Sequence, residues 1–567
     1  FTMKHFHFYQ LITGVSFFAT LLFAFPNTIQ WLEEDDLFLF TNEYITSVFL
    51  RQQGVAYLIV NFIEQFFSNV IVGSLIYTLV LLLSTEILYL VFRKIGKNNI
   101  LFLALIPAPI IVLFVFPDLV PSVSLLFFAL ALLGFVSLKT PVIRCTYALA
   151  LPLLSYMVMP WSVASIMFIG FSVIELTINK KKISAVIMLL AVIESLLVPA
   201  IWSDMASFIP FENRPFEGLG EGVTIGVLIT YAIIIIVLAL HISYYFKKWI
   251  GYVATIAVSL LFCITLATDD LHTFVERMQK VSRMADNKDW SGILSEISYE
   301  DYRRNKAYMC YSMLAESALG TLPHNLMKYS INDPENFLFR HESNSYLVNF
   351  NRQFYENIGI WDEAFRQAFE YGINSRENEC FKTLRHKTDY ALATYDLGTA
   401  EKYINLLKRS CNNTKWVSIR AAKLDSLKKT TFPERPYRSD TFVDAYPIAS
   451  SMIRLLERDK NNKKILDYLL CSLLLQKEVD KFGIILKNFN LYEGEPLPRV
   501  YAEAVAALSF KDSTVRKLGN YDTNLENQYV DCVNKARNGE NCSSYAGTYW
   551  SYLLFAQLPS KKESSQQ

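Results

Sequence analysis

Residues 69–92 read NVIVGSLIYTLVLLLSTEILYLVF, and the only charged side chain in this run is Glu86. An α-helix needs about 20 predominantly apolar residues to cross the hydrocarbon core of a bilayer. This stretch is long and apolar enough, and similar runs lie on both sides of it. We predict about nine transmembrane segments, at residues 9–29, 69–92, 100–116, 120–138, 144–159, 161–178, 183–202, 223–245 and 249–268.

Charge divides the chain of 567 residues into two parts. Residues 1–268 contain 27 charged residues and residues 269–567 contain 80. The first part is far below the charged fraction of soluble domains, which is about a quarter, so a purely soluble enzyme is excluded. We predict an all-α protein with a polytopic membrane domain over 1–268 and a helical domain over 269–567. The net charge of +1 offers no electrostatic surface for nucleic acid.

The short loops between the predicted segments alternate between basic and non-basic. One side of the membrane would hold eleven of the thirteen Lys and Arg residues of 1–268, and the other side only Arg51 and Arg214. Positive charge marks the cytoplasmic side, which places the N-terminus in the cytoplasm. With nine segments, residues 269–567 then lie outside. We therefore expect a multi-pass protein of the cytoplasmic (inner) membrane with a periplasmic C-terminal domain.

Four consecutive acids, Glu33, Glu34, Asp35 and Asp36, open a long first external loop over residues 30–68. Crowded carboxylates raise the pKa of at least one member, and they also form an oxygen-rich site for a divalent cation such as Mg²⁺ or Mn²⁺. Either property suits a general base at the membrane surface. The alternative is an ordinary solvated run of charge.

A lipid-linked phosphate at this surface would need a cation beside it. Arg51 and Arg214 are the external candidates in this half, although each also fits an ion pair with a neighbouring acid. We assign Glu194 and Gln65 to a cavity. Glu194, in the middle of the seventh segment, is either functional in a water-filled cavity or a neutral, hydrogen-bonded carboxyl between helices.

The order of these features resembles the GT-C superfamily of integral-membrane glycosyltransferases. The shared features are a first span, a long first external loop with an acidic start and amphipathic helices, a polytopic bundle, and an external C-terminal domain. The resemblance implies a sugar donor on a polyprenyl phosphate, a membrane-lipid environment, and a base or metal ligand at Asp35 or Asp36, with Glu34 as a further candidate. The stretch 54–67 also resembles an uncharacterised polytopic family of Bacteroidota.

The C-terminal domain contains a more specific pattern. Residues 355–369, with Gly359, Trp361, Ala364 and Ala368, resemble the turn and second helix of a tetratricopeptide repeat. A second copy starts at Tyr395, and its Gly398 follows Gly359 by 39 residues. The resemblance implies an α-solenoid whose surface binds a protein or glycan acceptor. Membrane bundles joined to such repeats are known in enzymes similar to protein O-mannosyltransferases.

Six of the eight cysteines lie in the predicted external part, where oxidation is possible. Cys532 and Cys542 flank a turn of the form Arg-Asn-Gly-Glu-Asn and are the predicted disulfide.

Three functions remain open at this point. The favoured one is a GT-C-like glycosyltransferase that moves a sugar from a polyprenyl-linked donor to an acceptor outside the membrane. The second is a non-enzymatic, membrane-anchored repeat scaffold for envelope or secretion assembly. The third is a transporter or lipid flippase, in which Glu194 would matter most.

Overall fold

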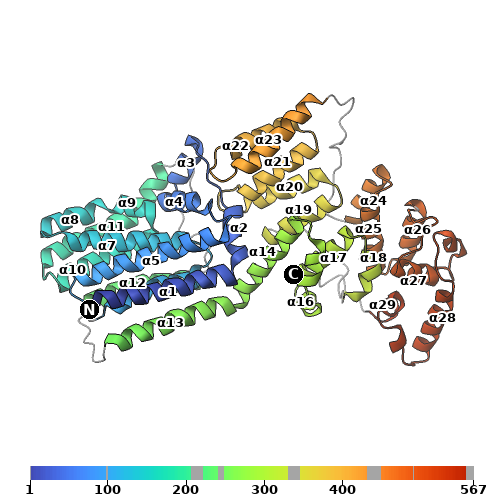
Figure 1. The fold of residues 1–567 in the computed structure, drawn as a ribbon, viewed down its shortest axis with the longest axis horizontal. Helices are drawn as coiled ribbons and strands as arrows, with labels where there is room; N and C mark the ends of the chain where they lie inside the picture. Colours follow the sequence, from blue (N-terminus) through green and yellow to red (C-terminus); the bar gives the residue numbers. More distant parts are fainter. Residues whose placement is uncertain are drawn as a thin grey trace. The chain divides into compact units, whose positions relative to one another are not determined.

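The computed structural model describes residues 2–97, 100–205, 221–240, 248–329, 345–430, 448–489 and 491–556, and this part of the chain is helical throughout (Figure 1). It contains a single isolated β-bridge, between Pro496 and Asn520. The all-α prediction is confirmed. The chain forms two compact units: unit 1 comprises Phe1–Arg277, Cys380–Lys382 and Ile404–Ile419, and unit 2 comprises Met278–Glu379, Thr383–Tyr403 and Arg420–Gln567. Residues 380–382 and 404–419 therefore belong to unit 1, although we predicted that this part of the protein ends at residue 268.

Unit 1 contains the apolar helices. They are α1 (Thr2–Ala24), α5 (Val70–Lys94), η1 (Leu101–Leu105), α6 (Pro107–Val115), α7 (Val120–Ser137), α8 (Pro141–Ala150), α9 (Pro152–Val158), α10 (Trp161–Thr177), α11 (Lys182–Met205), α12 (Glu221–Ala239) and α13 (Lys248–Thr268). Among the described residues, five helices (α1, α5, α7, α11 and α13) are long and apolar enough to cross a membrane, and the bent pair α8 and α9 makes up to six. The other predicted segments coincide with shorter apolar helices at 101–115, 161–177 and 224–239. This composition fits a membrane protein.

Two hydrogen bonds from the basic end of α5 connect it to the ends of two other helices of unit 1. Lys94, at the end of α5, donates from Nζ to Ser137 Oγ at the end of α7. Lys97 donates to the carbonyl oxygen of Leu240, which follows α12. The ends of these three helices therefore lie together, as expected of loops that share one side of a membrane.

A buried ion pair lies between α8 and α10 in unit 1. Arg144 donates from Nε to Glu175 Oε2 (2.8 Å) and from Nη2 to Oε1 (2.9 Å), and the two side chains are only 8% and 0% exposed. Arg144 Nη1 also donates to the carbonyl oxygens of Leu138 and Lys139. The two-point geometry satisfies both carboxylate oxygens of Glu175, and this explains an acid within an apolar helix.

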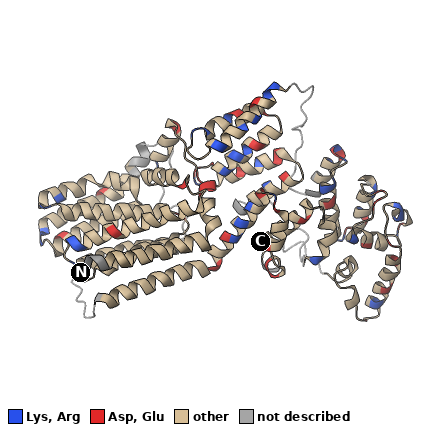
Figure 2. Cartoon of the chain, viewed as in Figure 1, with Lys and Arg blue, Asp and Glu red and all other residues tan. Residues whose placement is uncertain are grey.

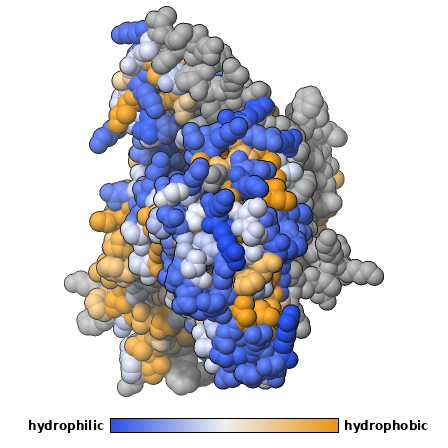
Figure 3. Space-filling view, turned by 90° about the vertical axis from the view of Figure 1, so that its right-hand side faces the viewer, coloured by the Kyte–Doolittle hydropathy of each residue, from blue (hydrophilic) through white to orange (hydrophobic). Residues whose placement is uncertain are grey.

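Unit 2 is richly charged, in contrast to α5–α13 (Figure 2). Its helices, after α14 (Asp270–Asp286), which spans the boundary between the units, are α15 (Trp290–Glu296), α16 (Tyr299–Arg304), α17 (Lys306–Ala318), α18 (Leu322–Asn325), η2 (Leu326–Lys328), α19 (Ser345–Asn357), α20 (Trp361–Ile373), α21 (Phe381–Ala393), α22 (Leu397–Leu407), α23 (Thr414–Lys429), α24 (Ile448–Arg458), α25 (Lys463–Leu475), α26 (Val479–Phe489), α27 (Arg499–Leu508), η4 (Ser513–Lys517), α28 (Asn524–Arg537), η5 (Ser543–Tyr545) and α29 (Tyr549–Phe555). Short pieces of α21, α22 and α23 belong to unit 1. Figure 3 looks onto the C-terminal helices and shows a mostly hydrophilic surface with small hydrophobic patches.

One turn geometry recurs between helices of unit 2. A helix ends, the second residue after it has a positive φ, and the next helix starts two residues later; these residues are Lys288, Gly320, Gly359, Tyr395 and Lys477. In each turn the residue after the one with positive φ donates its backbone N–H to a carbonyl oxygen five residues earlier in the chain. This is the Schellman arrangement that closes a helix.

The recurrent turn changes the predicted repeat register. Gly398, which we aligned with Gly359, lies inside α22, and the residue equivalent to Gly359 is Tyr395. The prediction followed the glycines, but a non-glycine residue can occupy the left-handed position at some conformational cost.

Candidate functional site

The acidic run lies on a short helix of its own, α2 (Pro26–Asp35). We expected it in a loop directly after a first span ending at residue 29. Instead α1 ends at Ala24, because Pro26 lacks the N–H that would continue that helix, and Pro26 then starts α2. Glu33, Glu34 and Asp35 form the last turn of α2, and Asp36 caps its end in extended conformation.

Glu276, from α14, fixes the start of α2. Its Oε1 accepts hydrogen bonds from the backbone N and the side-chain amide of Asn27, at 2.9 and 2.7 Å. Its Oε2 accepts from the backbone N and the hydroxyl of Thr28, both at 2.7 Å. A carboxylate at a helix N-terminus satisfies free N–H groups and interacts favourably with the helix dipole. The direction and position of α2 are therefore set by a residue about 250 positions away.

At the C-terminal end of α2 the helix dipole is unfavourable for acidic side chains. A helix C-terminus carries partial negative charge, so Glu33, Glu34 and Asp35 lie where acidic side chains are disfavoured. Two polar side chains of unit 1 contact them. Lys382 Nζ lies 3.3 Å from Glu34 Oε2, and Asn412 Nδ2 lies 3.3 Å from Glu33 Oε1. Helix stability alone does not account for three acids at this end.

Burial separates the four acids into two classes. Glu33 and Asp36 are 2% and 3% exposed, whereas Glu34 and Asp35 are half-buried. Lys382 is itself only 5% exposed. Glu34 and Asp35 are therefore the carboxylates that a bound molecule would reach, while Glu33 and Asp36 are enclosed by the protein.

Two further helices, α3 (Asn42–Phe49) and α4 (Gly54–Glu64), follow the acidic run. The hydroxyl of Tyr44 donates to the carbonyl oxygen of Leu37 and accepts from Asn61 Nδ2 at 2.9 Å, which ties both helices to the residue after Asp36. Gly54 is needed where α4 begins, because a Cβ there would collide with the carbonyl oxygens of Val48 and Phe49. Both helices lie within residues 30–68, which we predicted as the first external loop.

Helix α4 is joined to the end of unit 1 at which α7 begins and α9 ends. Gln53, the residue before α4, donates from its backbone N to the carbonyl oxygen of Tyr156 at 2.9 Å. Its Oε1 accepts from Ser124 Oγ at 3.2 Å. Glu64, at the other end of α4, is a fully buried acid (1% exposed). The segment 30–68, predicted as the first external loop, is therefore a packed layer of helices rather than an open loop.

The segment 404–419 completes this layer of unit 1. Phe40 N donates to the carbonyl oxygen of Arg409 (2.8 Å), and Cys411 N donates to Gln65 Oε1 (2.9 Å). Asn412 Nδ2 also donates to Ser68 Oγ (3.0 Å). Gln65, predicted to line a cavity, is fully buried and holds this segment through its amide oxygen.

The other predicted site residues lie elsewhere or outside the described part. Arg51 is half-buried in the turn between α3 and α4, and Arg214 lies outside the described residues. Glu194 lies on an exposed face of α11. Within the described ranges, no three or more His, Cys, Asp or Glu side chains are grouped to hold a metal ion, and this includes Asp35 and Asp36.

The predicted disulfide partners are neighbours but not bonded. Cys532, in α28, is buried, and Cys542 Sγ lies 4.0 Å from its carbonyl oxygen. Both are free thiols in this structure.

Sequence reasoning did not identify Glu276, Lys382 or Asn412. Each meets α2 from a position between 248 and 379 residues away, and no local pattern marks them. The signal that was available is the acidic run itself, since four adjacent carboxylates require cations or donors from somewhere.

These features define the class of the protein: a polytopic helical membrane protein with a large charged helical unit and an acidic layer at one end of its apolar bundle. The chain matches the family of unknown function DUF6057 over residues 2–556, and it belongs to that family. No curated protein and no solved structure matches it.

Proposed function

We propose that this protein is a GT-C-like membrane glycosyltransferase that moves a sugar from a polyprenyl-linked donor to an acceptor at the acidic end of unit 1. The observation that carries the proposal is the arrangement at the end of α2. Three acids occupy a helix end that disfavours them, and the nearly buried Lys382 lies beside the half-buried Glu34. Groups kept at a cost to stability are characteristic of functional sites.

The proposed reaction uses an acid as base and a cation beside the leaving group. Glu34 or Asp35 takes the proton of the acceptor hydroxyl as the acceptor oxygen bonds to the anomeric carbon of the sugar. The bond between that carbon and the phosphate oxygen breaks, and its electron pair leaves with the polyprenyl phosphate. Lys382, with Arg51 as the second candidate, stabilises the negative charge on that phosphate.

A divalent cation such as Mg²⁺ or Mn²⁺ is an optional part of this proposal. Of the two predicted ligands, Asp35 would hold it together with the donor phosphate, since Asp36 is enclosed by the protein and carboxylate and phosphate oxygens are its preferred ligands. Transfer assayed with and without EDTA decides whether the metal is needed.

The proposal includes an orientation. All nine apolar segments cross the cytoplasmic membrane, the basic ends face the cytoplasm, and the acidic layer and unit 2 lie in the periplasm. The helical hairpins of unit 2 form a solenoid that binds the protein or glycan acceptor. Cysteines introduced at Ser184 and at Glu43 test this orientation when intact cells are treated with thiol reagents that do or do not cross the membrane.

Two measurements test the chemistry on the full chain in nanodiscs. Native mass spectrometry compares retention of undecaprenyl phosphate with that of the neutral alcohol undecaprenol. A transfer assay follows release of radiolabelled sugar from a panel of undecaprenyl-phosphate hexoses. We expect preferential retention of the phosphate, at least tenfold weaker retention by Lys382→Met, and at least a hundredfold slower transfer by Glu34→Gln or Asp35→Asn with retention unchanged.

Matched controls come from the same unit. Glu43 is an exposed acid of α3 and Lys408 an exposed lysine near the end of α22, so Glu43→Gln and Lys408→Met should behave as wild type. Equal retention of phosphate and alcohol, or full transfer activity in both acid variants, would overturn the proposal.

The non-enzymatic scaffold is the second candidate, and the recurrent Schellman turns of unit 2 favour it. Repeated helix pairs present an extended binding surface without needing any chemistry. Under this function, substitutions on exposed faces of unit 2 would abolish function, and Glu34→Gln and Asp35→Asn would leave it intact.

A further inference from the structure

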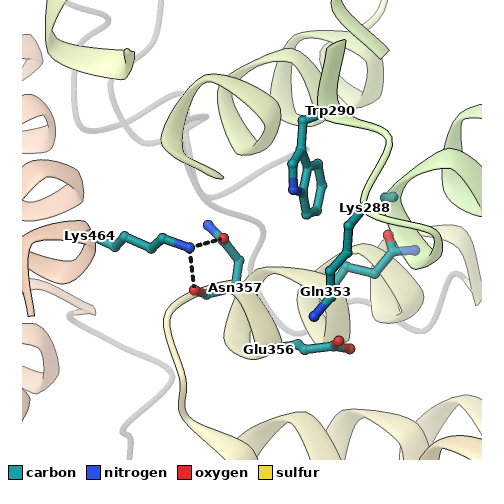
Figure 4. Close-up of a pocket in the computed structure, with 7 residues that line it drawn as sticks. Lys288, Trp290, Gln353, Glu356, Asn357 and Lys464 are labelled. Atoms are coloured by element: carbon teal, nitrogen blue, oxygen red, sulfur yellow. Dashed lines mark hydrogen bonds between the residues drawn. The ribbon is translucent and has the colours of Figure 1, made fainter. Parts of the chain in front are cut away.

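A pocket lies entirely within unit 2, beside the first of the recurrent turns. It encloses about 110 Å³ and is lined by residues from α14, α15, α19, α25 and the turn after α14: Ala285, Lys288, Trp290, Gln353, Glu356, Asn357 and Lys464 (Figure 4). The lining combines two lysines, one carboxylate, two amides and an indole. No part of the acidic layer of unit 1 contributes to it.

The two lysines give the pocket a positive wall. Lys464 Nζ donates to the backbone oxygen and to Oδ1 of Asn357, at 3.3 and 2.8 Å, and both of these acceptors are neutral. Burial, and then the nearby charge of Lys288, lower the pKa of Lys464. Within the part of the chain that the structure describes, neither lysine has a carboxylate partner. A bound anion would relieve their mutual repulsion.

Glu356 and Gln353 form a fixed polar wall. Glu356 Oε2 accepts from Arg352 Nη1 at 3.1 Å and from Tyr390 OH at 2.8 Å, and Arg352 is only 1% exposed. Gln353 is 3% exposed, and its Nε2 donates to Ser282 O and Asp286 Oδ1, both at 2.8 Å. Its Oε1 is buried and accepts no hydrogen bond from the described residues. A buried amide oxygen of this kind is suited to a donor brought by a ligand.

Trp290 is the third feature of the pocket lining, beside the two lysines and the polar wall. It is the first residue of α15, and its ring extends from that helix end into the space between Lys464 and Lys288 (Figure 4). An indole face packs against the apolar C–H face of a saturated ring such as a pyranose, and the polar groups around it can pair with hydroxyls. Ring hydroxyls, a flat apolar face and a negative charge occur together in acidic and phosphorylated sugars.

We infer that this pocket binds a single saccharide unit that carries a carboxylate or a phosphate. Its anionic group pairs with Lys464 under the added positive charge of Lys288, its ring lies on Trp290, and its hydroxyls pair with Gln353 and Glu356. This binding holds whether or not the acidic end of unit 1 transfers a sugar.

Isothermal titration calorimetry of the full chain in detergent tests the inference with four probes: glucuronic acid, glucose 1-phosphate, glucose and inorganic phosphate. We expect at least one of the two anionic sugars to bind at least tenfold more tightly than both glucose and phosphate. The anionic sugar that binds identifies the source of the charge.

Two adjacent lysines of α25 provide the matched variants. Lys464→Met should weaken binding of the anionic sugar at least tenfold. Lys463→Met should not, because Lys463 is exposed and pairs with Glu495 instead. Trp290→Leu should weaken glucuronate and glucose to a similar extent, with an unchanged melting temperature as evidence of folding.

Three results would overturn the inference: no binding of either anionic sugar, equal binding by the Lys464 and Lys463 variants, or phosphate alone binding as tightly as the sugar acid.

Discussion

Among the residues that the structure describes, each unit buries one arginine, and the surroundings of the two differ. Arg144 in unit 1 has a single carboxylate partner, Glu175, in addition to two backbone oxygens. Arg352 in unit 2 contacts Asp286 and Glu356, and also Asn349 Oδ1 and Tyr390 OH. An apolar bundle thus gives its buried charge one ionic partner, whereas the charged unit surrounds its arginine with several. The loss of one partner should therefore matter far more in unit 1.

The largest effect tests this difference directly. Arg144→Met leaves Glu175 buried without its cation, which should cost about 3–5 kcal/mol of stability. Thermal unfolding in detergent measures the loss. Glu356→Gln in unit 2 should cost only about 1 kcal/mol, because Arg352 keeps Asp286 and its neutral acceptors. Equal losses in the two variants would refute the comparison, and Arg144→Met combined with Glu175→Met should recover most of the stability.

Asp467 sharpens the comparison because it is a buried acid of unit 2 that is held by tyrosines. Its Oδ1 accepts from Tyr492 OH at 2.6 Å and from Tyr501 OH at 2.9 Å. Burial raises the pKa of Asp467 to about 6, although both tyrosines oppose the rise. The unfolded chain releases this proton near pH 4 and the folded chain only near pH 6. Stability from this group is therefore complete below about pH 4 and lost as the pH rises towards 6 and beyond.

The measurement is urea unfolding of wild type and Asp467→Asn across this range. Relative to the variant, which cannot titrate at this position, wild type should lose about 3 kcal/mol between pH 4 and pH 7. A constant difference between the two proteins would show that Asp467 has an ordinary pKa.

The next prediction concerns the formation of a disulfide in unit 2 under oxidising conditions. Cys542 Sγ lies 4.0 Å from the carbonyl oxygen of Cys532 in unit 2, and a disulfide between these residues, which closes a loop of this size, should add about 2–3 kcal/mol. Burial raises the pKa of the Cys532 thiol, so oxidation should accelerate as the pH rises above neutral. Non-reducing peptide mass analysis detects the bond, and Cys542→Ser is the control. Recovery of only unlinked peptides after oxidation would exclude the bond.

The smallest effect concerns the turns of unit 2. Gly359 has a φ of +80° with open space around its Cα, so Gly359→Ala should cost about 1–2 kcal/mol through the backbone alone. Gly398 lies within α22 in open surroundings, and Gly398→Ala should stabilise by up to about 1 kcal/mol. Melting temperatures that shift in opposite directions support the register with Tyr395 at the turn. Destabilisation by both substitutions would instead indicate that Gly398, and not Tyr395, occupies the left-handed turn position.

Features that depend on local composition were predictable from the sequence. The apolar runs are helices in the structure, because a long apolar stretch must satisfy its backbone internally. The acidic run could be recognised as a candidate site because four adjacent charges are visible in the sequence without any knowledge of the fold.

Features that depend on distant partners were not predictable. The partner of Glu175 is Arg144, which comes from another helix. The start of α2 depends on Glu276, and its end on Lys382 and Asn412. A left-handed turn position occupied by Tyr395 rather than glycine likewise leaves no signal in composition.

The make-up of unit 1 has a consequence for how the protein is synthesised. Its acidic layer includes residues 380–382 and 404–419, which leave the ribosome long after the last apolar helix. Vectorial membrane insertion can therefore be finished while the acidic end is still incomplete. We expect this end to mature late in biogenesis, since a nascent chain arrested before residue 380 would carry all five candidate spans of the described residues and yet lack both Lys382 and Asn412.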